Sequence, residues 1–341
     1  MSHTVVLIPG DGIGPEVANA VRRVLEAAKA PVEFVVRYAG EAALERGMDG
    51  VLPEETVQSI REHGVALKGP CTTPIGRGFS SVNVALRKKL NLYAAVRPFR
   101  SLSGVKTRYD DVDLIVVREN TEGLYSGIEN LITDGVVVSM KVATRVACRR
   151  ISHWAFRHAT HRKRRKITVF HKANIMKMSD GMLLEEARAV HEQDYPNIEY
   201  EEVIVDAGHM KLVQNPKQFD IILCENLYGD IVSDLCAGLV GGLGVSPGAN
   251  IGEAGAVFEA VHGSARDIAG QGVANPLALL MSAVMMLDHL SETRKDEACR
   301  AAAQRVKRGY DRALEEGQKT RDLGGSLGTI EFADAVIARM S

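Results

Sequence analysis

Two aspartates, Asp230 and Asp234, stand four residues apart where an apolar strand gives way to a helical pattern. This spacing puts both carboxylates on one helix face, about 5–6 Å apart. Two like charges this close repel each other unless a cation lies between them, and hard oxygen ligands suit Mg²⁺ or Mn²⁺. Asp206, after a strand predicted over 200–205, is a third candidate ligand. The alternative is a pair of solvated carboxylates, although the residues around them are mostly apolar.

A group of arginines surrounds a predicted helix N-terminus. Residues 76–83 predict a loop and Val84 onward predicts a helix, so Ser81 or Asn83 would lie beside free backbone amides that bind anions. Several guanidinium groups near such a terminus suit a substrate with several carboxylates. A surface ion pair is the alternative, and it fits any one arginine better than all of them together. The arginines are Arg87, Arg97, Arg100 and Arg118.

Lys172 and Tyr125 follow predicted strands, at the edge of the sheet where α/β proteins build their sites. A lysine near cations or a bound metal can have a lowered pKa and act as a base, and a tyrosine can act as an acid. For either residue alone, packing or a surface role is the alternative.

The glycine-rich segment Gly10–Pro15 follows a strand and opens a helix, as a dinucleotide-binding fingerprint does. However, Pro15 occupies the third glycine position, and no acidic residue ends the second strand at the expected distance. We therefore reject a Rossmann fingerprint at this loop.

Strand and helix patterns alternate along the chain, which predicts a largely parallel, doubly wound α/β fold. Residues 135–142 are strand-like with no helix before them, and they fit an antiparallel pair that docks on a partner subunit. The predicted strands are 4–8, 32–38, 65–68, 113–117, 167–171, 200–205 and 220–224. Predicted helices begin at Pro15, Pro53, Pro276 and Glu292, and Gly64 closes the second of them.

The composition excludes several classes of protein. The 341 residues carry a formal net charge of -1 and 5% aromatic residues, so no basic surface or stacking platform for nucleic acid is expected. The five cysteines lack metal-binding spacing and suggest free thiols in a reducing compartment. The first residues show no signal or transit pattern, and the apolar stretch 277–287 is too short to cross a membrane. We therefore expect a cytoplasmic protein without a nucleic-acid or membrane partner.

Together these residues resemble the β-decarboxylating dehydrogenase family, which includes isocitrate, isopropylmalate, homoisocitrate and tartrate dehydrogenases. The resemblance implies two interwoven α/β domains. Residues 1–93 plus 248–341 would form a large cofactor-binding domain, and 94–247 a small substrate and dimerisation domain, with a β clasp at about 123–143 at the dimer interface. The strongest stretches of similarity are 69–74, 118–122, 171–176, 225–234 and 259–265.

The family's chemistry implies a metal-dependent oxidative decarboxylation with Mg²⁺ or Mn²⁺. By resemblance, Lys172 is the base and proton shuttle, Tyr125 is the acid, and Asp230 and Asp234 bind the metal. Asp206 would complete the metal site from the neighbouring subunit, which would also supply Lys172. The resemblance thus implies a homodimer or higher homo-oligomer with shared active sites.

The implied reaction converts isocitrate to 2-oxoglutarate with reduction of NAD. Ser81 and Asn83 resemble isocitrate enzymes rather than the acidic and apolar pattern of isopropylmalate enzymes. Asp267 and Ile268 stand where NADP-using relatives place lysine and tyrosine, which favours NAD. The implied substrate-binding residues are Thr72, Ser81, Asn83, Arg87, Arg97, Arg118 and Asn174. The implied cofactor-binding residues are Ile13, Thr72, Glu259, His262, Gly263, Asp267, Ile268 and Asn275.

Two alternatives remain beside this interpretation. A homoisocitrate dehydrogenase would need a modest change of the substrate pocket, against which Ser81 and Asn83 speak. A non-catalytic regulatory subunit would have lost catalytic or metal-binding residues, and here Tyr125, Lys172 and all three aspartates are present.

Overall fold

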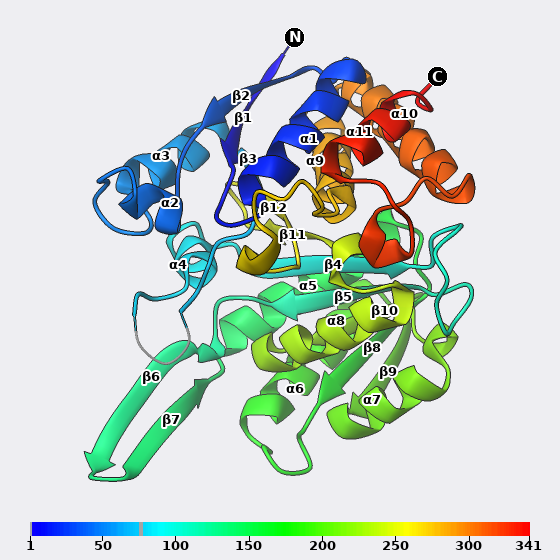
Figure 1. The fold of residues 1–341 in the computed structure, drawn as a ribbon. Helices are drawn as coiled ribbons and strands as arrows, with labels where there is room; N and C mark the ends of the chain where they lie inside the picture. Colours follow the sequence, from blue (N-terminus) through cyan, green and yellow to red (C-terminus); the bar gives the residue numbers. More distant parts are fainter. Residues whose placement is uncertain (1, 75–77) are drawn as a thin grey trace.

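A computed structural model describes residues 2–74 and 78–341, so Gly76 and Arg77 of the predicted loop lie outside the described residues. The fold is α/β, as the sequence predicts (Figure 1). The strands are β1 (His3–Ile8), β2 (Val32–Val36), β3 (Val65–Lys68), β4 (Ala94–Arg100), β5 (Asp113–Glu119), β6 (Gly123–Thr133), β7 (Val136–Val142), β8 (Lys166–His171), β9 (Glu199–Ile204), β10 (Ile221–Cys224), β11 (Pro247–Ile251) and β12 (Ala256–Ala260). The α-helices are α1 (Gly14–Ala27), α2 (Glu41–Leu44), α3 (Glu54–His63), α4 (Val82–Lys89), α5 (Arg145–His161), α6 (Ser179–Asp194), α7 (Val205–Gln214), α8 (Asn226–Val240), α9 (Leu277–Arg294), α10 (Glu297–Glu315) and α11 (Thr329–Ile337).

Ten strands form one continuous sheet in the order β2-β1-β3-β12-β11-β4-β5-β10-β8-β9. The strands are parallel toward both ends of the sheet. In the middle, β11 runs antiparallel to both β12 and β4, and β4 runs antiparallel to β5. The expectation of a largely parallel sheet therefore holds for the two ends and is wrong for the centre.

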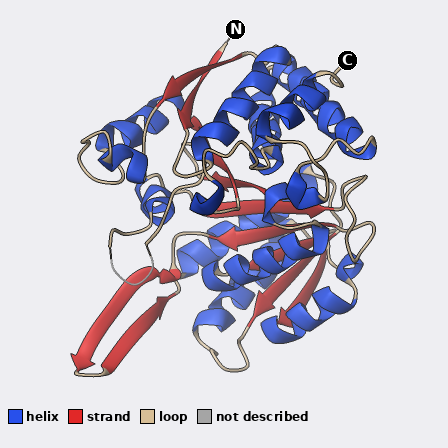
Figure 2. Cartoon of the chain, in the orientation of Figure 1, coloured by secondary structure: helices blue, strands red, loops and turns tan. Residues whose placement is uncertain are grey.

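The helices cover the sheet on both faces (Figure 2). Helix α8 packs on β4, β5 and β10, while α5 packs on β5, β8 and β10 from the opposite face. Helix α9 packs on β3, β11 and β12. Because side chains alternate between the faces of a strand, each central strand contributes residues to both sides of the sheet.

Local signals explain most element boundaries. Pro15 lies in the first turn of α1, and Gly64 ends α3 in the left-handed region at a φ of 76°, both as predicted. The helix predicted from Val84 begins at Val82 instead, because the Ser81 hydroxyl caps it by accepting a hydrogen bond from the Val84 amide.

The C-terminal part of the chain differs from the prediction of two helices. Three α-helices follow residue 276, and Glu292 lies inside α9 rather than at the start of the next helix. Helix α9 ends because Lys295 adopts a φ of 54°, and α10 begins after Asp296, whose carboxylate accepts the Ala298 amide at 2.9 Å. The prediction placed this break a few residues too early, because no glycine or proline marks it, and it missed the third helix, α11.

Strands β6 and β7 form a separate two-stranded sheet that projects from the body of the protein (Figure 1). We call it the β arm. Tyr125 and Lys141 of the β arm contact the body of the protein, but most of its large apolar residues are exposed. These exposed residues are Leu124, Ile128, Leu131, Ile132, Val136, Val137, Val138 and Met140. An exposed apolar surface of this size is unusual on a protein and is typical of a contact surface.

We expect Gly10→Ala to lower the free energy of unfolding by more than about 3 kcal/mol. Gly10 has a φ of +83°, and an added Cβ would lie 2.1 Å from the carbonyl oxygen of Pro70. Gly47→Ala is the matched control, because Gly47 has a φ of +69° with open space around it, so only backbone strain of about 1 kcal/mol applies. Urea denaturation measures the free energy of unfolding of both variants. If both lost the same amount relative to wild type, the close backbone contact at Gly10 would be contradicted.

Candidate functional site

The glycine loop 10–14 packs against two other loops of the chain. The buried Asp11 carboxylate accepts the backbone amides of Ala42 and Thr72 at 2.9 and 2.8 Å. The amide of Ile13 donates to the Ser264 carbonyl at 2.9 Å, and the hydroxyls of Thr72 and Ser264 share a hydrogen bond of 2.9 Å. The loop thus positions Thr72, and no sequence pattern indicated that Asp11 anchors it.

A cavity of about 130 Å³ opens beside this loop, between α4 and the strands β3, β11 and β12. Among the described residues, three buried polar atoms that line it have no hydrogen-bond partner: Asn83 Oδ1, Arg87 Nε and His262 Nε2. Buried polar atoms without partners are costly, so these atoms are suited to bind a polar ligand. Gly263 also lines the cavity, and Arg97 forms part of its wall.

Glu259 holds the cationic side of this cavity in place. Its carboxylate pairs with Lys68 at 2.7 Å and with Arg87 at 3.3 Å, and it accepts a hydrogen bond from Asn250 at 2.7 Å. Burial would raise the pKa of Glu259, but Lys68 and Arg87 outweigh burial and hold that pKa at about 2. In this structure Glu259, implied as a cofactor contact, orients the predicted substrate ligand Arg87.

Sequence reasoning missed Lys68 and Asn250. A lysine that ends the fully buried strand β3 was the available signal, because a buried ammonium group needs a carboxylate partner. Asn250 carried no comparable signal, since its role depends on the pairing of β11 with β12.

Asp230 is the centre of a second group of side chains. Its carboxylate pairs with Arg118 and with Arg97, and it accepts the hydroxyl hydrogen of Tyr125. Burial would raise the pKa of Asp230, but Arg118 and Arg97 outweigh it and lower that pKa. Burial, followed by the neighbouring arginines, lowers the pKa of Arg118 to about 10. Asn226 accepts hydrogen bonds from Arg118 at 2.9 Å and fixes its orientation.

Tyr125 and Asp234 lie on either side of this group. Burial, and then the hydrogen bond to Asp230, raise the pKa of Tyr125, so the phenol keeps its proton and can donate it. Asp234 is exposed one helical turn beyond Asp230, and burial of its carboxylate raises its pKa. Asp230 and Asp234 thus present hard oxygen donors on one face of α8, which fits a divalent cation.

Lys172 and Asp206 form a third group on the same edge of the sheet. Lys172 follows β8, Asp206 opens α7 after β9, and their side chains pair at 2.5 Å. Asn174 is exposed in the loop after Lys172. Among the described residues, no hydrogen bond or ion pair joins this group to Asp230 or Asp234.

The three aspartates therefore do not gather into one metal site within the described part of a single chain. There, the only group of three potential ligands with atoms within 4.8 Å of one another is His3, Asp296 and Cys299. The contribution of Asp206 and Lys172 to a neighbouring subunit's site stays a prediction.

A buried ionic network ties the β arm to the Lys172 loop. Lys141 of β7 pairs with Asp180 and Glu225, and the second oxygen of Asp180 accepts the Lys172 amide at 2.7 Å. Sequence reasoning missed all three of these charged residues, because their contact joins strands and helices far apart in the sequence. A movement of the β arm would therefore be transmitted to the backbone of Lys172.

We expect the stability contributed by Glu225 to fall as pH rises. Burial is the main cause that raises its pKa from 4.5 to about 7, with Lys141 opposing and Asp180 adding to the shift. The folded state therefore binds a proton that the unfolded state releases above pH 4.5. The difference in unfolding free energy between wild type and Glu225→Gln should fall between pH 4.5 and 7, by at most about 1.4 kcal/mol per pH unit. Urea denaturation at several pH values measures it, and a difference that rises with pH would contradict the shift.

The remaining predicted cofactor contacts lie around residues 263–275. Asp267 and Ile268 lie in a short 3-10 helix, Arg266–Ile268, in which no residue is buried. Arg266 pairs with Glu41. The amide group of Asn275 donates to Asp322 at 2.9 Å, while its oxygen accepts the Leu277 amide.

Comparison with known proteins identifies the family. Residues 4–336 match the family model described as isocitrate/isopropylmalate dehydrogenase. Isocitrate dehydrogenase (NAD) catalytic subunit 5, mitochondrial, of Arabidopsis thaliana is 51% identical over 98% of this chain and 87% of its own length. A regulatory chain of the corresponding mitochondrial enzyme of Dictyostelium discoideum is 48% identical over 99% of this chain and 92% of its own. The chloroplastic 3-isopropylmalate dehydrogenase of Solanum tuberosum is 54% identical over 83% of this chain and 79% of its own length.

A solved structure agrees with these relatives. Isocitrate dehydrogenase from Methylococcus capsulatus superposes with a TM-score of 0.93 and is 46% identical, with 99% of both chains covered. The relatives include both catalytic and regulatory subunits, so similarity alone does not decide between these roles.

The expectation of a cytoplasmic protein is wrong, because similar isocitrate dehydrogenase subunits are named as mitochondrial. That expectation rested partly on free thiols, which indicate a reducing compartment and do not separate the cytosol from the mitochondrial matrix. In the described ranges, no helix is long and apolar enough to cross a membrane. With the family model matched over nearly the whole sequence, the chain belongs to the isocitrate/isopropylmalate dehydrogenase family.

Proposed function

We propose that this protein catalyses the NAD-dependent oxidative decarboxylation of isocitrate to 2-oxoglutarate and carbon dioxide. The observation that carries the proposal is the cationic cavity in which Asn83 and Arg87 present buried polar atoms that lack partners among the described residues. Arg97 lines the same cavity, and Arg118 lies beside it through their shared partner Asp230. Several guanidinium side chains this close together suit a substrate with several carboxylates.

The balance of charge supports a tricarboxylate. The cavity and the adjacent end of α8 hold four cationic side chains and three carboxylates. The cations are Lys68, Arg87, Arg97 and Arg118, and the carboxylates are Glu259, Asp230 and Asp234. The excess is one positive charge, and a divalent cation would raise it to three. Isocitrate carries three negative charges at neutral pH.

Asp230 and Asp234 would hold the divalent cation, Mg²⁺ or Mn²⁺, with Asp206 of a neighbouring subunit. When bound, the cation would stabilise negative charge on the substrate oxygens. Arg118 and Arg97 keep Asp230 ionised, since they lower its pKa against the effect of burial.

The remaining chemistry falls to side chains. The three arginines bind the substrate carboxylates and orient the reacting carbon. Lys172 Nζ accepts the proton of the substrate hydroxyl as hydride passes to NAD, after which the β-carboxylate leaves as carbon dioxide. Tyr125 Oη returns a proton to the resulting enol, and its raised pKa keeps that proton available.

The residues around the cavity also fit NAD. His262 Nε2 is buried and lacks a partner among the described residues, and burial lowers the pKa of His262, so the ring is a neutral hydrogen-bonding group. The exposed Asp267 would accept the ribose hydroxyls and repel the 2′-phosphate of NADP. Ile13, Thr72, Gly263, Ile268 and Asn275 would complete the cofactor contacts.

We further propose an oligomer with shared sites, in which segments 1–93 plus 248–341 and 94–247 act as two domains. The exposed apolar β arm would form the interface. Similar proteins are named as subunits, so whether the partner is a second copy of this chain or a related subunit is decided by experiment.

The test compares NAD⁺ and NADP⁺ reduction with isocitrate, homoisocitrate, isopropylmalate and tartrate, each with Mg²⁺ or Mn²⁺. We expect isocitrate with NAD⁺ to be preferred by at least about a hundredfold in kcat/KM. Faster turnover of homoisocitrate or isopropylmalate would overturn the roles of Ser81 and Asn83. Absence of turnover with every acid would favour the regulatory subunit, which the similarity to a regulatory chain keeps as a second candidate.

A further inference from the structure

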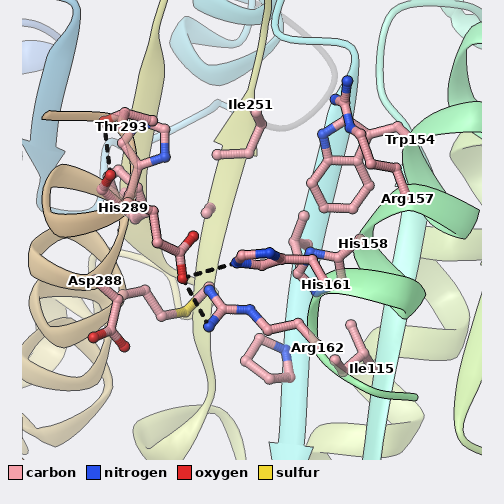
Figure 3. Close-up of a pocket in the computed structure, with 16 residues that line it drawn as sticks. Ile115, Trp154, Arg157, His158, His161, Arg162, Ile251, Asp288, His289 and Thr293 are labelled. Atoms are coloured by element: carbon pink, nitrogen blue, oxygen red, sulfur yellow. Dashed lines mark hydrogen bonds and ion pairs between the residues drawn. The ribbon is translucent and has the colours of Figure 1, made fainter. Parts of the chain in front are cut away.

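A second, larger cavity lies on the face of the sheet opposite the candidate active site. It has a volume of about 530 Å³, within the usual range for sites of small organic ligands. Helix α5 forms one wall and α9 the other, and the central strands form the floor (Figure 3). We name it the rear cavity.

The floor is apolar because of strand alternation. Val96, Pro98, Ile115, Ile251 and Phe258 point into the rear cavity. The neighbouring residues on the same strands point to the other face, where they build the candidate active site. These neighbours are Arg97, Arg118, Asn250 and Glu259.

Charged groups lie at the rim of the rear cavity. Glu292 of α9 pairs with His161 at 3.2 Å and with Arg162 at 3.1 Å, which ties the two walls together. Arg157 lines the cavity from α5 with an exposed side chain, and within the described ranges it forms no ion pair or side-chain hydrogen bond. Asp288 lies on the α9 side, at the opposite end of the view from Arg157 (Figure 3).

An aromatic pair completes the α5 wall. Trp154 stacks on His158, with ring centroids 4.7 Å apart and an angle of 16° between the rings. Burial lowers the pKa of His158 to about 3, so this ring stays neutral and adds no charge to the wall. Among the described residues, the cation left without a partner near the apolar floor is therefore that of Arg157.

We propose that the rear cavity binds a small carboxylate with an apolar body. The apolar body would lie on the strand floor against Trp154, and the carboxylate would pair with Arg157 at the rim. An apolar body alone would leave the exposed Arg157 guanidinium to solvent and make no use of it, and a small anion alone would leave the floor exposed to water. Asp288 at the other end favours a ligand with a single carboxylate rather than a dicarboxylate.

Occupancy of the rear cavity should also change substrate affinity, a consequence that rests on the proposed function. The side chains on the floor of the rear cavity and those of the candidate active site lie on opposite faces of the same four strands, β4, β5, β11 and β12. A ligand in the rear cavity would contact these strands directly, and any displacement of the strands would shift Arg97 and Arg118 relative to Glu259.

Fluorescence of Trp154 tests the site directly, because this is the only tryptophan in the chain. Octanoate is the probe, octanol supplies the same apolar body without charge, and acetate supplies the charge without the body. We expect a saturable change in emission with octanoate at a Kd below about 1 mM, and about tenfold weaker binding of octanol and acetate.

Variants separate the two parts of the proposal. Arg157→Gln should weaken octanoate binding about tenfold, whereas Arg165→Gln, an exposed arginine outside the cavity, should leave it unchanged. Ile251→Phe should fill the floor and weaken binding of octanoate and octanol alike. Equal binding of octanol and octanoate, or no effect of Arg157→Gln, would overturn the carboxylate ligand. Absence of a saturable signal in both fluorescence and calorimetry would overturn the site.

The coupling has its own readout. The KM for isocitrate should change at least about twofold when wild type is saturated with octanoate, and Arg157→Gln should need about ten times more octanoate for the same change. Binding without any change in KM would overturn the coupling and leave the site standing. If the protein turns over no acid, the proposed function fails, while Trp154 fluorescence still decides whether the site exists.

Discussion

Replacing Lys172 by methionine should lower kcat for isocitrate oxidation by about a thousandfold, the range expected for loss of a general base. The substitution removes the amine that we propose takes the substrate proton and leaves the three arginines in place, so KM should change little. Lys172 is partly exposed and its side chain pairs only with the exposed Asp206 among the described residues. The melting temperature should therefore stay within about 2 °C of wild type.

Lys177→Met is the matched control, because Lys177 is exposed in the segment after β8 and has no assigned role. Its kcat should equal that of wild type. If Lys172→Met retained more than about a tenth of the wild-type kcat, Lys172 would not be the base.

Mixing two inactive variants tests whether the site is shared. Asp234→Asn should be inactive through loss of a metal ligand. A dimer of one Asp234→Asn subunit and one Lys172→Met subunit would contain one site with both residues intact if Lys172 comes from the neighbouring subunit. Random exchange of subunits should then restore about a quarter of wild-type activity. No recovery from freely exchanging subunits would place both residues in one chain's site.

The second large effect should come from Lys68→Met, which we expect to lower the free energy of unfolding by about 3–5 kcal/mol. Lys68 is 1% exposed and lies 2.7 Å from the Glu259 carboxylate, which is itself buried. Among the described residues, removing the ammonium group leaves Glu259 with Arg87 as its only cationic partner. Urea denaturation at neutral pH measures the loss.

The double variant Lys68→Met/Glu259→Gln isolates the cause. Because the second substitution removes the buried negative charge, it should recover more than half of the stability lost in Lys68→Met. The same pair should raise the KM for isocitrate, since Arg87 loses its anchor. A double variant less stable than Lys68→Met would show that packing around Lys68, rather than its charge, carries the effect.

Much of the fold was predictable from local patterns. Residues 5–8 and 65–67 are continuous apolar runs, and both lie in strands of the sheet. Caps such as Gly64 ended helices where expected, because a left-handed residue stops a helix locally. Predictions were inaccurate where no local signal exists. The break after α9, at Lys295, was predicted a few residues too early, and the antiparallel centre of the sheet was not predicted.

The sequence by itself determined the family, the alternation of strands and helices, and the residue types available for chemistry. Asp230 and Asp234, four residues apart, share a face of α8 because helical geometry depends on local spacing alone. The tertiary structure decided the partnerships. Lys68 reached Glu259, and Lys141 reached Asp180 and Glu225, across separations that no periodicity encodes. It also decided that one sheet carries the arginines proposed to bind substrate on one face and the rear cavity on the other. Such contacts depend on strand order and on burial, and both arise only when the whole chain is packed.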